Sequence, residues 1–256
     1  MGTIISFANQ KGGVAKTTSV MTLGYALIMK KKKVLLVDID PQGSLTLYMG
    51  HNPNALEKTI YQVLLNDMSL KDVLMSRKNC PDLIPSNIEL SAAEIELMAA
   101  IERERVLKDV LETIRNEYDY ILLDCPPSLG ILTINALVTA RYIIIPLKTD
   151  YLSMKGVNLL LKTISRIQKR PNRELEIMGI LPTMYDQRTT HNREVLEETI
   201  KAFEGKLKVF DPIHKSVRFE EAPTGGSSIL NYSPDTPGAK GYIKLAEEVI
   251  KYEKEK

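Results

Sequence analysis

A short glycine-containing segment, residues 8–20, carries two lysines and two adjacent threonines at a spacing that suits phosphate binding. The apolar residues 4–7 precede it, and apolar residues at helical spacing follow it over 21–28. The first N–H groups of a helix lack internal partners and carry partial positive charge, so a strand–loop–helix junction can bind an anion. Lys16 adds a full charge there, and the hydroxyl of Thr17 can hold Mg²⁺. The segment therefore predicts a nucleotide-phosphate loop.

The loop departs from the usual phosphate-loop pattern, which has glycine at two fixed positions before the lysine. Gln10 and Ala15 stand at those positions, and an additional lysine, Lys11, begins the loop. If the backbone at Ala15 needs positive φ, its β-carbon destabilises the loop by about 1–2 kcal/mol. A chance Lys-Gly-Gly loop is the alternative, but the strand–loop–helix context favours nucleotide binding.

Three aspartates follow predicted strands. Asp38 and Asp40 come at the end of one apolar run, and Asp124 comes at the end of another. The carboxyl ends of parallel strands lie beside the phosphate loop in this architecture, where carboxylates hold Mg²⁺ through water or orient an attacking water. Together with the loop, they indicate hydrolysis of a nucleoside triphosphate. The alternative is that they only cap the turns that follow the strands.

Apolar strands alternate with helical segments along the chain, which predicts a doubly wound, mostly parallel sheet flanked by helices. The strands are expected at residues 4–7, 34–43 with the turn that ends it, 83–86, 120–127 with its final turn, 142–147 and 177–183, with an edge strand at 207–213. After the first helix, the helices are expected at 60–65, 70–74, 91–101 behind a capping box, 102–116, 129–140, 154–168, 190–203 and 237–253.

Composition limits the class of protein. The 256 residues contain 34 basic and 32 acidic side chains, for a net charge of +2, so any nucleic-acid contact must come from a local patch. Cys80 and Cys125 have neither metal-type nor disulfide-framework spacing, which favours a reducing compartment. No apolar run approaches the roughly 20 residues that span a bilayer. We expect one cytoplasmic domain over 1–256, without an N-terminal helix-turn-helix extension or a membrane partner.

Several motifs in one order resemble the ParA/Soj family of deviant-Walker ATPases, which partition plasmids and chromosomes. They are residues 9–18, 37–43 and 123–130, and the resemblance continues through 181–189 and 217–223, so it covers essentially the whole chain. It implies a P-loop fold, hydrolysis of ATP with Mg²⁺, and a homodimer in the ATP state. It also implies binding to non-specific double-stranded DNA, stimulation by a ParB-like partner, and association with the nucleoid.

The resemblance also implies roles for individual residues. Lys16 binds the β- and γ-phosphates, Lys11 reaches the nucleotide of a second subunit, and Asp40 positions the attacking water. The nucleotide-binding set is Lys11, Gly12, Gly13, Val14, Ala15, Lys16, Thr17 and Thr18, with His214, Lys215 and Val217 as adenine-pocket candidates. The metal set is Thr17, Asp38 and Asp124. Relatives usually read Ile-Pro-Arg-Asn where this chain has residues 213–216, and glycine where it has Ala15.

The DNA-binding residues that the resemblance implies are basic. Arg188 and Arg218 fall at the matching positions, and Lys215, Lys240 and Lys244 could extend the patch, although a solvated surface role explains each lysine equally well. A positioner of protein cargo, using the same ATP and DNA chemistry, is the alternative function. A non-catalytic ATP-binding scaffold is also open if Ala15 abolishes turnover. A MinD-like membrane ATPase is disfavoured by the charged C-terminal residues 250–256, and an iron–sulfur carrier by the cysteine spacing.

Overall fold

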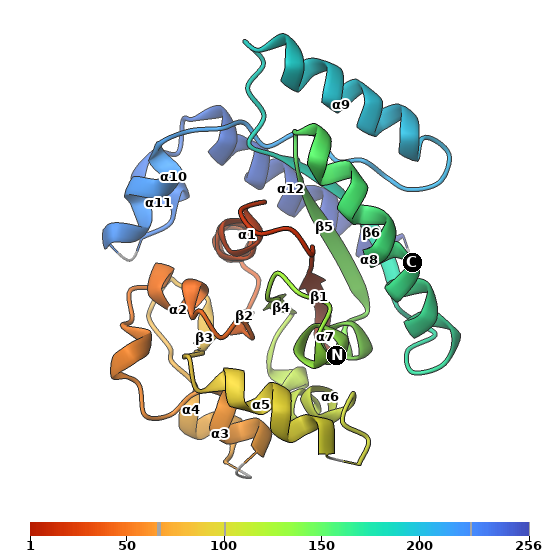
Figure 1. Cartoon of the computed structure of the whole chain (residues 1–256). Helices are drawn as coiled ribbons and strands as arrows, with labels where there is room; N and C mark the ends of the chain where they lie inside the picture. Colours follow the sequence, from red (N-terminus) through yellow and green to blue (C-terminus); the bar gives the residue numbers. More distant parts are fainter. Residues whose placement is uncertain (66–67, 100, 226, 256) are drawn as a thin grey trace.

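The computed structural model describes residues 1–65, 68–99, 101–225 and 227–255. Its described strands form one six-stranded parallel sheet in the order β3-β2-β4-β1-β5-β6 (Figure 1). The strands are β1 (Thr3–Phe7), β2 (Val34–Asp38), β3 (Asp82–Ile84), β4 (Tyr120–Asp124), β5 (Tyr142–Lys148) and β6 (Glu176–Thr183). This confirms the doubly wound α/β architecture.

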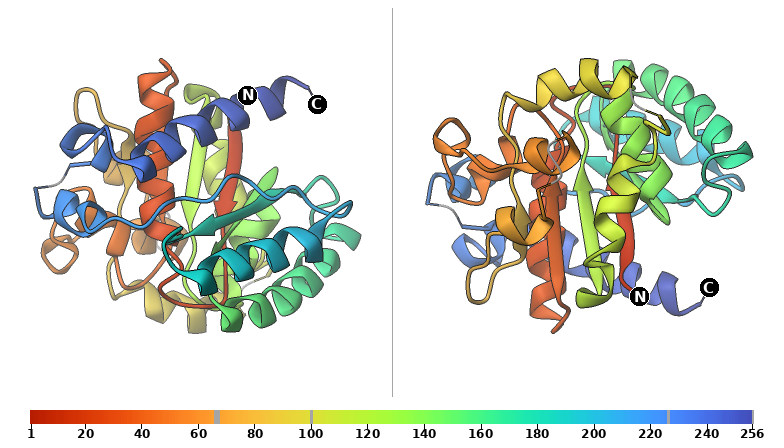
Figure 2. Two further views of the ribbon diagram at one scale, coloured as in Figure 1. Left: turned by 90° about the horizontal axis from the view of Figure 1, so that it is seen from above. Right: turned by 90° about the horizontal axis from the view of Figure 1, so that it is seen from below.

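Helices cover both faces of the sheet (Figure 2). One face packs against α1 (Lys16–Met29), α11 (Ile229–Tyr232) and α12 (Pro237–Lys254). The other packs against α3 (Ile60–Leu65), α5 (Leu90–Glu96), α6 (Val106–Glu112), α7 (Ile131–Thr139) and α8 (Tyr151–Lys169). Successive strand residues alternate between the two cores, as Ile4 and Ile5 do, because side chains of a strand point to opposite faces. Strands buried on both faces need continuous apolar runs, which is what the sequence has.

Four further helices and four single turns complete the described part of the chain. They are α2 (Ser44–Tyr48), α4 (Leu70–Val73), α9 (Thr190–Phe203), α10 (Arg218–Glu221) and the single 3₁₀ turns η1 (Pro53–Ala55), η2 (Leu97–Ala99), η3 (Arg115–Glu117) and η4 (Ala222–Gly225). The lysines at 30–33 follow the end of α1, as predicted, with Lys30 as its C-cap. No helix within the described ranges is long and apolar enough to cross a membrane.

The predicted edge strand at 207–213 is wrong as a strand. The segment runs beside β6 and makes an isolated bridge between Val209 and Ile180, with N–H···O distances of 2.9 Å on both sides of Ile180. The N–H of Ile213 also donates to the carbonyl of Pro182 at 2.8 Å, but the two contacts do not join into a ladder. Proline lacks the N–H that a ladder needs, and Pro182 of β6 and Pro212 of the segment interrupt the pairing just beyond that bridge.

Two predicted helix starts are also wrong. Ser91 lies inside α5 rather than at its N-cap, because Asn87 makes the turn before the helix and its side chain accepts from the backbone N–H of Glu89 at 3.2 Å. The predicted helix at 102–116 shortens to α6, since Glu102 has φ 51°, which a helix cannot contain. Residue 100 of the predicted 91–101 helix lies outside the described residues.

Gly179 in β6 gives a test of how closely the 207–213 segment approaches the sheet. A β-carbon there would lie 2.6 Å from the ring of Phe210 and 2.9 Å from the carbonyl oxygen of Lys208. We expect Gly179→Ala to lower the free energy of unfolding by about 1–3 kcal/mol, the usual penalty for overpacking.

The measurement is thermal or urea unfolding of the nucleotide-free protein. Gly156→Ala is the matched control, because a β-carbon on Gly156 meets nothing within 4 Å and the residue lies inside α8. There, alanine should stabilise the protein by about 0.5–1 kcal/mol. An unchanged or higher midpoint for Gly179→Ala would contradict the close packing.

Candidate active site

The candidate site forms where the central strands end at one edge of the sheet. Phe7, the last residue of β1, lies in register with Asp124 of β4, and Asp124 lies in register with Asp38 of β2. The loop that follows β1 therefore begins beside the two carboxylates that end the neighbouring strands. The sequence prediction that these groups meet at one edge is confirmed.

Hydrogen bonds from neighbouring strands hold the loop in place. The Asn9 side chain, 1% exposed, donates to the carbonyl of Pro146 at 2.7 Å and accepts from the backbone N–H of Lys11 at 3.0 Å. The Thr183 hydroxyl donates to the carbonyl of Val14 at 3.1 Å. The side chain of Val14 is buried, whereas Gly12 and Gly13 are exposed at the tip, with φ 66° at Gly13. The loop is thus tied to β5 and β6 while its tip faces outward.

Ala15 is the N-cap of α1 and has φ 60° and ψ 34°, the left-handed conformation. It makes no side-chain capping bond, so the first N–H groups of α1 remain for an anion. The sequence predicted that Ala15 destabilises the loop if its backbone adopts positive φ. It does adopt positive φ, so the β-carbon destabilises the loop by about 1–2 kcal/mol. Thr17 and Thr18 follow in the first turn and are half-buried.

Lys16 is buried beside the carboxylates. Its ammonium donates to the carbonyl oxygen of Lys11 at 3.3 Å, which curls the loop around the side chain. Burial lowers the pKa of Lys16, and the nearby carboxyl of Asp124 is the main group that opposes that shift. The lysine thus provides positive charge in a place from which most water is excluded.

The carboxylate of Asp124 is fully buried, and neither of its oxygens has a hydrogen-bond partner among the described residues. Burial raises its pKa well above the ordinary value, the charge of Asp38 adds to the shift, and the nearby Thr17 and Lys16 oppose it. A buried unsatisfied carboxylate is costly, so this one points to a group that completes the site. Together with the Thr17 hydroxyl it fits a hydrated cation.

Asp38 is buried but satisfied. Its carboxylate accepts from the N–H and hydroxyl of Thr46, each at 2.8 Å, and from the N–H of Asp40 at 3.1 Å. Burial nevertheless raises the pKa of Asp38 to about 7. No cluster of three or more His, Cys, Asp or Glu side chains within the described ranges could hold a metal by itself. A cation here must therefore take most of its ligands from phosphate and water.

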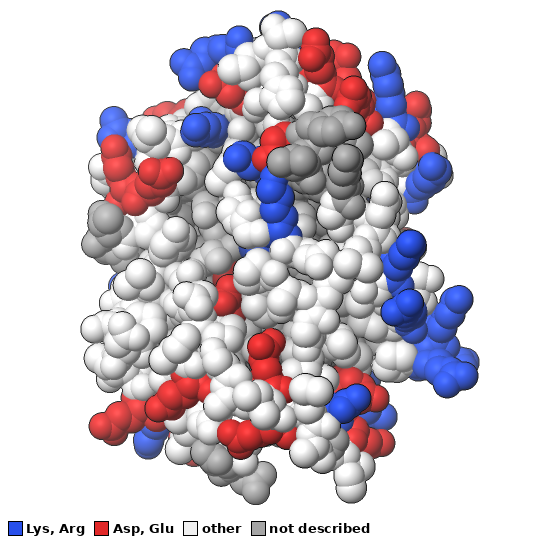
Figure 3. Space-filling model, in the orientation of Figure 1, with Lys and Arg blue, Asp and Glu red and all other residues white. Residues whose placement is uncertain are grey.

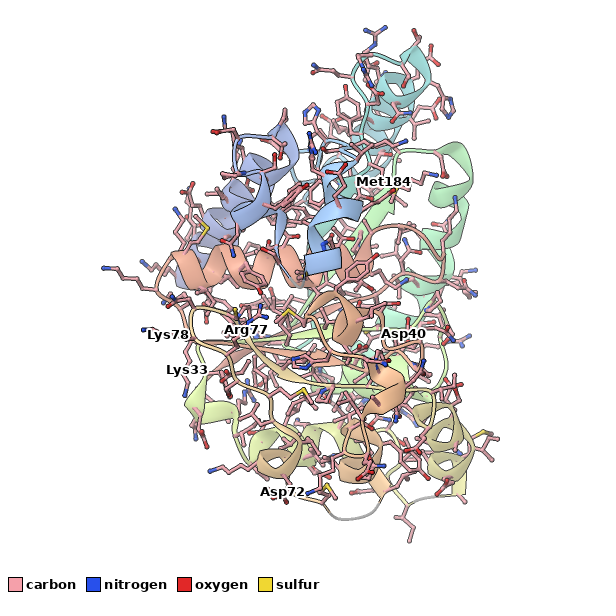
Figure 4. All side chains as sticks on the ribbon, turned by 90° about the vertical axis from the view of Figure 1, so that its left-hand side faces the viewer. Lys33, Asp40, Asp72, Arg77, Lys78 and Met184 are labelled. Carbon is pink, nitrogen blue, oxygen red and sulfur yellow. The ribbon has the colours of Figure 1, made fainter. Side chains whose placement is uncertain are left out.

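Asp40 and Lys11 each bind another residue of the chain. The Asp40 carboxylate accepts from the N–H of Gln42 at 3.0 Å, and the residue is 9% exposed. Figure 4 shows Asp40 in the right half of the view, and Lys33, Arg77 and Lys78 in the left half. The Lys11 ammonium lies 2.7 and 2.9 Å from the two carboxylate oxygens of Asp150, which follows β5 in the same chain.

A cavity of about 570 Å³ adjoins the loop, a size in the usual range for small-molecule sites. Its lining includes Ala15, Thr18, Tyr48, Lys148, Asp150, Met184, His214, Lys215 and Phe219. His214 and Lys215, which the resemblance gives as adenine-pocket candidates, line this cavity together with Ala15 and Thr18. Val217 is 63% exposed and is not among the lining residues, so that candidate finds no support in the geometry. The face in Figure 3 is hollowed at its centre.

Sequence reasoning missed several residues of the cavity. Met184, just beyond the end of β6, has φ 55°, and Asp150 follows the end of β5. The signal that could have found them is position, because ligands bind beyond the carboxyl ends of strands in this fold. Tyr48 and Phe219 come from α2 and α10, and no local pattern predicted their approach.

The predicted DNA-binding residues are exposed, and most of them are paired with acids. Arg188 forks onto Asp186 at 2.9 and 2.8 Å, and Arg218 contacts Glu221 at 2.6 Å. Lys240 lies 3.7 Å from Asp235, and Lys244 pairs with Asp211. Lys215 lines the cavity instead. The structure therefore does not bring these five residues together as one uncompensated basic patch.

The loop, the buried lysine and the strand-end aspartates define a P-loop nucleotide-binding protein. A family model described as an AAA domain (AAA_31) matches residues 2–177. The sporulation initiation inhibitor protein Soj of Bacillus subtilis is 44% identical over 97% of this chain and 98% of its own length. The chromosome partitioning protein ParA of Caulobacter vibrioides is 39% identical over 99% and 96%. The chain belongs to the Soj/ParA family of partitioning ATPases within the AAA_31 domain family.

A solved structure agrees. A Mycobacterium smegmatis protein named cobyrinic acid a,c-diamide synthase, solved with ADP or an ATP analogue and magnesium, matches with a TM-score of 0.88. It is 38% identical, and the match covers 99% of this chain and 96% of that one. The fold and the nucleotide-binding edge are thus those of a P-loop ATPase.

Ala15→Gly should stabilise the nucleotide-free protein. Glycine removes the left-handed penalty of about 1–2 kcal/mol but adds unfolded-chain entropy, so we expect a net gain on the order of 0.5–1 kcal/mol. Urea unfolding measures it. Ala26→Gly, inside α1, is the matched control and should destabilise by about 1 kcal/mol. A loss of stability in both variants would show that Ala15 is not strained.

Asp124→Asn should stabilise the nucleotide-free protein increasingly as pH rises. The pKa of Asp124 is higher in the folded state than in the unfolded state. Its contribution to the free energy of unfolding is therefore fully present below about pH 4 and is lost as the pH rises through the folded-state pKa. The amide cannot ionise, and the variant should gain about 1–3 kcal/mol over wild type near pH 8. Unfolding at pH 5 and 8 measures this, with exposed Asp235→Asn as control. An equal effect at both pH values would contradict it.

Proposed function

We propose that this protein is an ATP-dependent DNA-partitioning ATPase. It binds ATP and Mg²⁺, forms a homodimer in the ATP state, binds non-specific double-stranded DNA on the nucleoid, and hydrolyses ATP when a ParB-like partner stimulates it. The observation that carries the proposal is the buried Lys16 beside the unsatisfied carboxylate of Asp124, in a loop that begins with a second lysine. The family membership and the nucleotide-bound relative support it.

Each residue has a role that its surroundings support. Lys16 holds the β- and γ-phosphates, and the N–H groups of the loop and of α1 bind phosphate oxygens, as the open N-terminus of α1 allows. When bound, Mg²⁺ would neutralise charge on the phosphates. Thr17, Asp38 and Asp124 are the residues that would hold it, the two carboxylates through water. Asp40, oriented by the N–H of Gln42, accepts a hydrogen bond from the attacking water.

Lys11 is proposed to act on the nucleotide of the partner subunit. In this structure it contacts Asp150 of its own chain, and a partly exposed ion pair contributes only about 0–1 kcal/mol. A triphosphate carries more charge than one carboxylate, so phosphate can replace Asp150 as the partner of Lys11. ATP would then join two subunits, and dimerisation would place the DNA-binding surfaces of both on one face.

Asp40→Ala separates binding from hydrolysis. The variant should form an ATP-dependent dimer and remain bound to DNA, while phosphate release falls at least 100-fold, in the range that a positioned general base contributes. Lys16→Ala is the control and should lose nucleotide binding, dimerisation and the ATP-dependent part of DNA retention together. Size-exclusion chromatography with light scattering, electrophoretic mobility shift with mixed-sequence duplex DNA, and phosphate release measure the three properties.

A wild-type protein that binds ATP but stays monomeric and off DNA would overturn the proposed function. DNA retention by Asp40→Ala without added nucleotide, equal to that with ATP, would show that the nucleotide does not control DNA binding.

A further inference from the structure

The C-terminal half of α8 and the loop after it belong to a stretch of the chain without an acidic residue. Residues 151–173, between Asp150 and Glu174, contain no Asp or Glu. Five exposed cations of this stretch form what we call the α8 basic surface: Lys162, Arg166, Lys169, Arg170 and Arg173. None of the five belongs to the DNA-binding set that the sequence predicted.

Helical spacing places the basic residues on one side. Lys162, Arg166 and Lys169 stand at i, i+4 and i+7, which share a helix face. The buried Ile164 and Ile167, 0% and 5% exposed, hold the other side of α8 against the core. In Figure 3, blue side chains gather at the right-hand edge of the molecule, where α8 ends in Figure 1.

The five cations are not neutralised. None of them forms an ion pair with another residue in the described part of the chain, in contrast to Arg188, Arg218, Lys240 and Lys244. Cations near a helix C-terminus gain about 0.3–1 kcal/mol from the helix dipole, which accounts for Arg166 and Lys169. It does not account for Arg170 and Arg173, which lie beyond the end of α8, so charge repulsion on this surface is not offset within the subunit.

The composition of the surface favours a phosphate backbone over a protein partner. Three of the five cations are arginines, whose planar guanidinium binds phosphate oxygens in pairs. A protein interface needs buried apolar or aromatic anchors, and Leu159 is the one large apolar side chain that is strongly exposed in the described part of 156–173. Cations four residues apart on a helix are about 6 Å apart along its axis, which suits a duplex with one charge per about 1.7 Å.

We propose that the α8 basic surface is a second site for the DNA backbone, separate from Arg188 and Arg218 and complete within one subunit. The inference rests on the proposed DNA-binding function. Because the surface is complete without a partner subunit, it gives each monomer weak affinity for DNA in any nucleotide state. A subunit released from the dimer by hydrolysis then stays near the DNA instead of diffusing away at once.

The salt dependence of binding distinguishes one surface from two. With Arg188 and Arg218 alone, a dimer neutralises four phosphates, and the slope of log K against log salt is about −3.6. If Arg166, Lys169 and Arg170 each add one phosphate per subunit, the slope becomes about −9. The triple variant Arg166→Gln, Lys169→Gln, Arg170→Gln should return the dimer to about −3.6. Glutamine keeps the helix propensity of α8.

The experiment measures fluorescence anisotropy of a labelled 40-base-pair mixed-sequence duplex, with ATP and with ADP, from about 50 to 200 mM salt, the range over which such slopes are resolved. The control Lys31→Gln, Lys78→Gln, Lys254→Gln removes the same charge from exposed sites elsewhere. We expect the α8 triple variant to lose the ADP-state binding at low salt and to show the shallower slope with ATP. Basal phosphate release without DNA, and circular dichroism, should match wild type.

Equal slopes and affinities for the α8 variant and the control would overturn the inference while leaving the proposed function intact. A wild-type protein that binds no DNA in either nucleotide state would overturn both. If the α8 variant keeps DNA binding but loses binding to labelled poly-L-glutamate, the surface serves an acidic protein segment instead, and the inference is wrong.

Discussion

The buried carboxylate of Asp124 is the constraint on which the site depends. Parallel pairing places it between β1 and β2, where its oxygens have no partner in the described part of the chain. The fold tolerates such a group because Lys16 lies beside it and Asp38 is satisfied separately by Thr46. A site that combines a carboxylate of raised pKa with a buried ammonium suits a charged ligand. Such a ligand supplies the partners that the buried carboxylate and ammonium lack in the protein alone.

Rigidity around that carboxylate comes from distant segments. Asn9 and Thr183 tie the loop to β5 and β6, and Asp38 fixes Asp40 through its backbone N–H. Ala15 holds a left-handed conformation that glycine would adopt without strain. Strain at a functional loop persists only where the surroundings over-determine the backbone, and these hydrogen bonds do so here.

Local patterns in the sequence predicted what local physics controls. The apolar runs specified the sheet, and the loop with its lysines specified the phosphate site, because both depend on residues adjacent in sequence. The prediction of a strand at 207–213 was wrong because the pairing of this segment depends on the position of Pro182 in β6. Met184 and Asp150 were missed because their place in the cavity follows from sheet order, which hydrophobic periodicity does not specify.

Charge illustrates the same distinction. The net charge of +2 does not distinguish basic residues that the fold pairs with acids from basic residues that it leaves unpaired. The pairing of Arg188 with Asp186 arises from a spacing of two residues, whereas that of Lys244 with Asp211 joins segments far apart in the chain. The acid-free stretch 151–173 rules out pairing with acids nearby in sequence, and the structure gives none of its five exposed cations an ion pair among the described residues. A run of one charge sign becomes evidence for a polyanion surface only where the fold brings no acid to it, because Lys30 and Arg141 also lie in acid-free stretches and pair with Glu247 and Glu176.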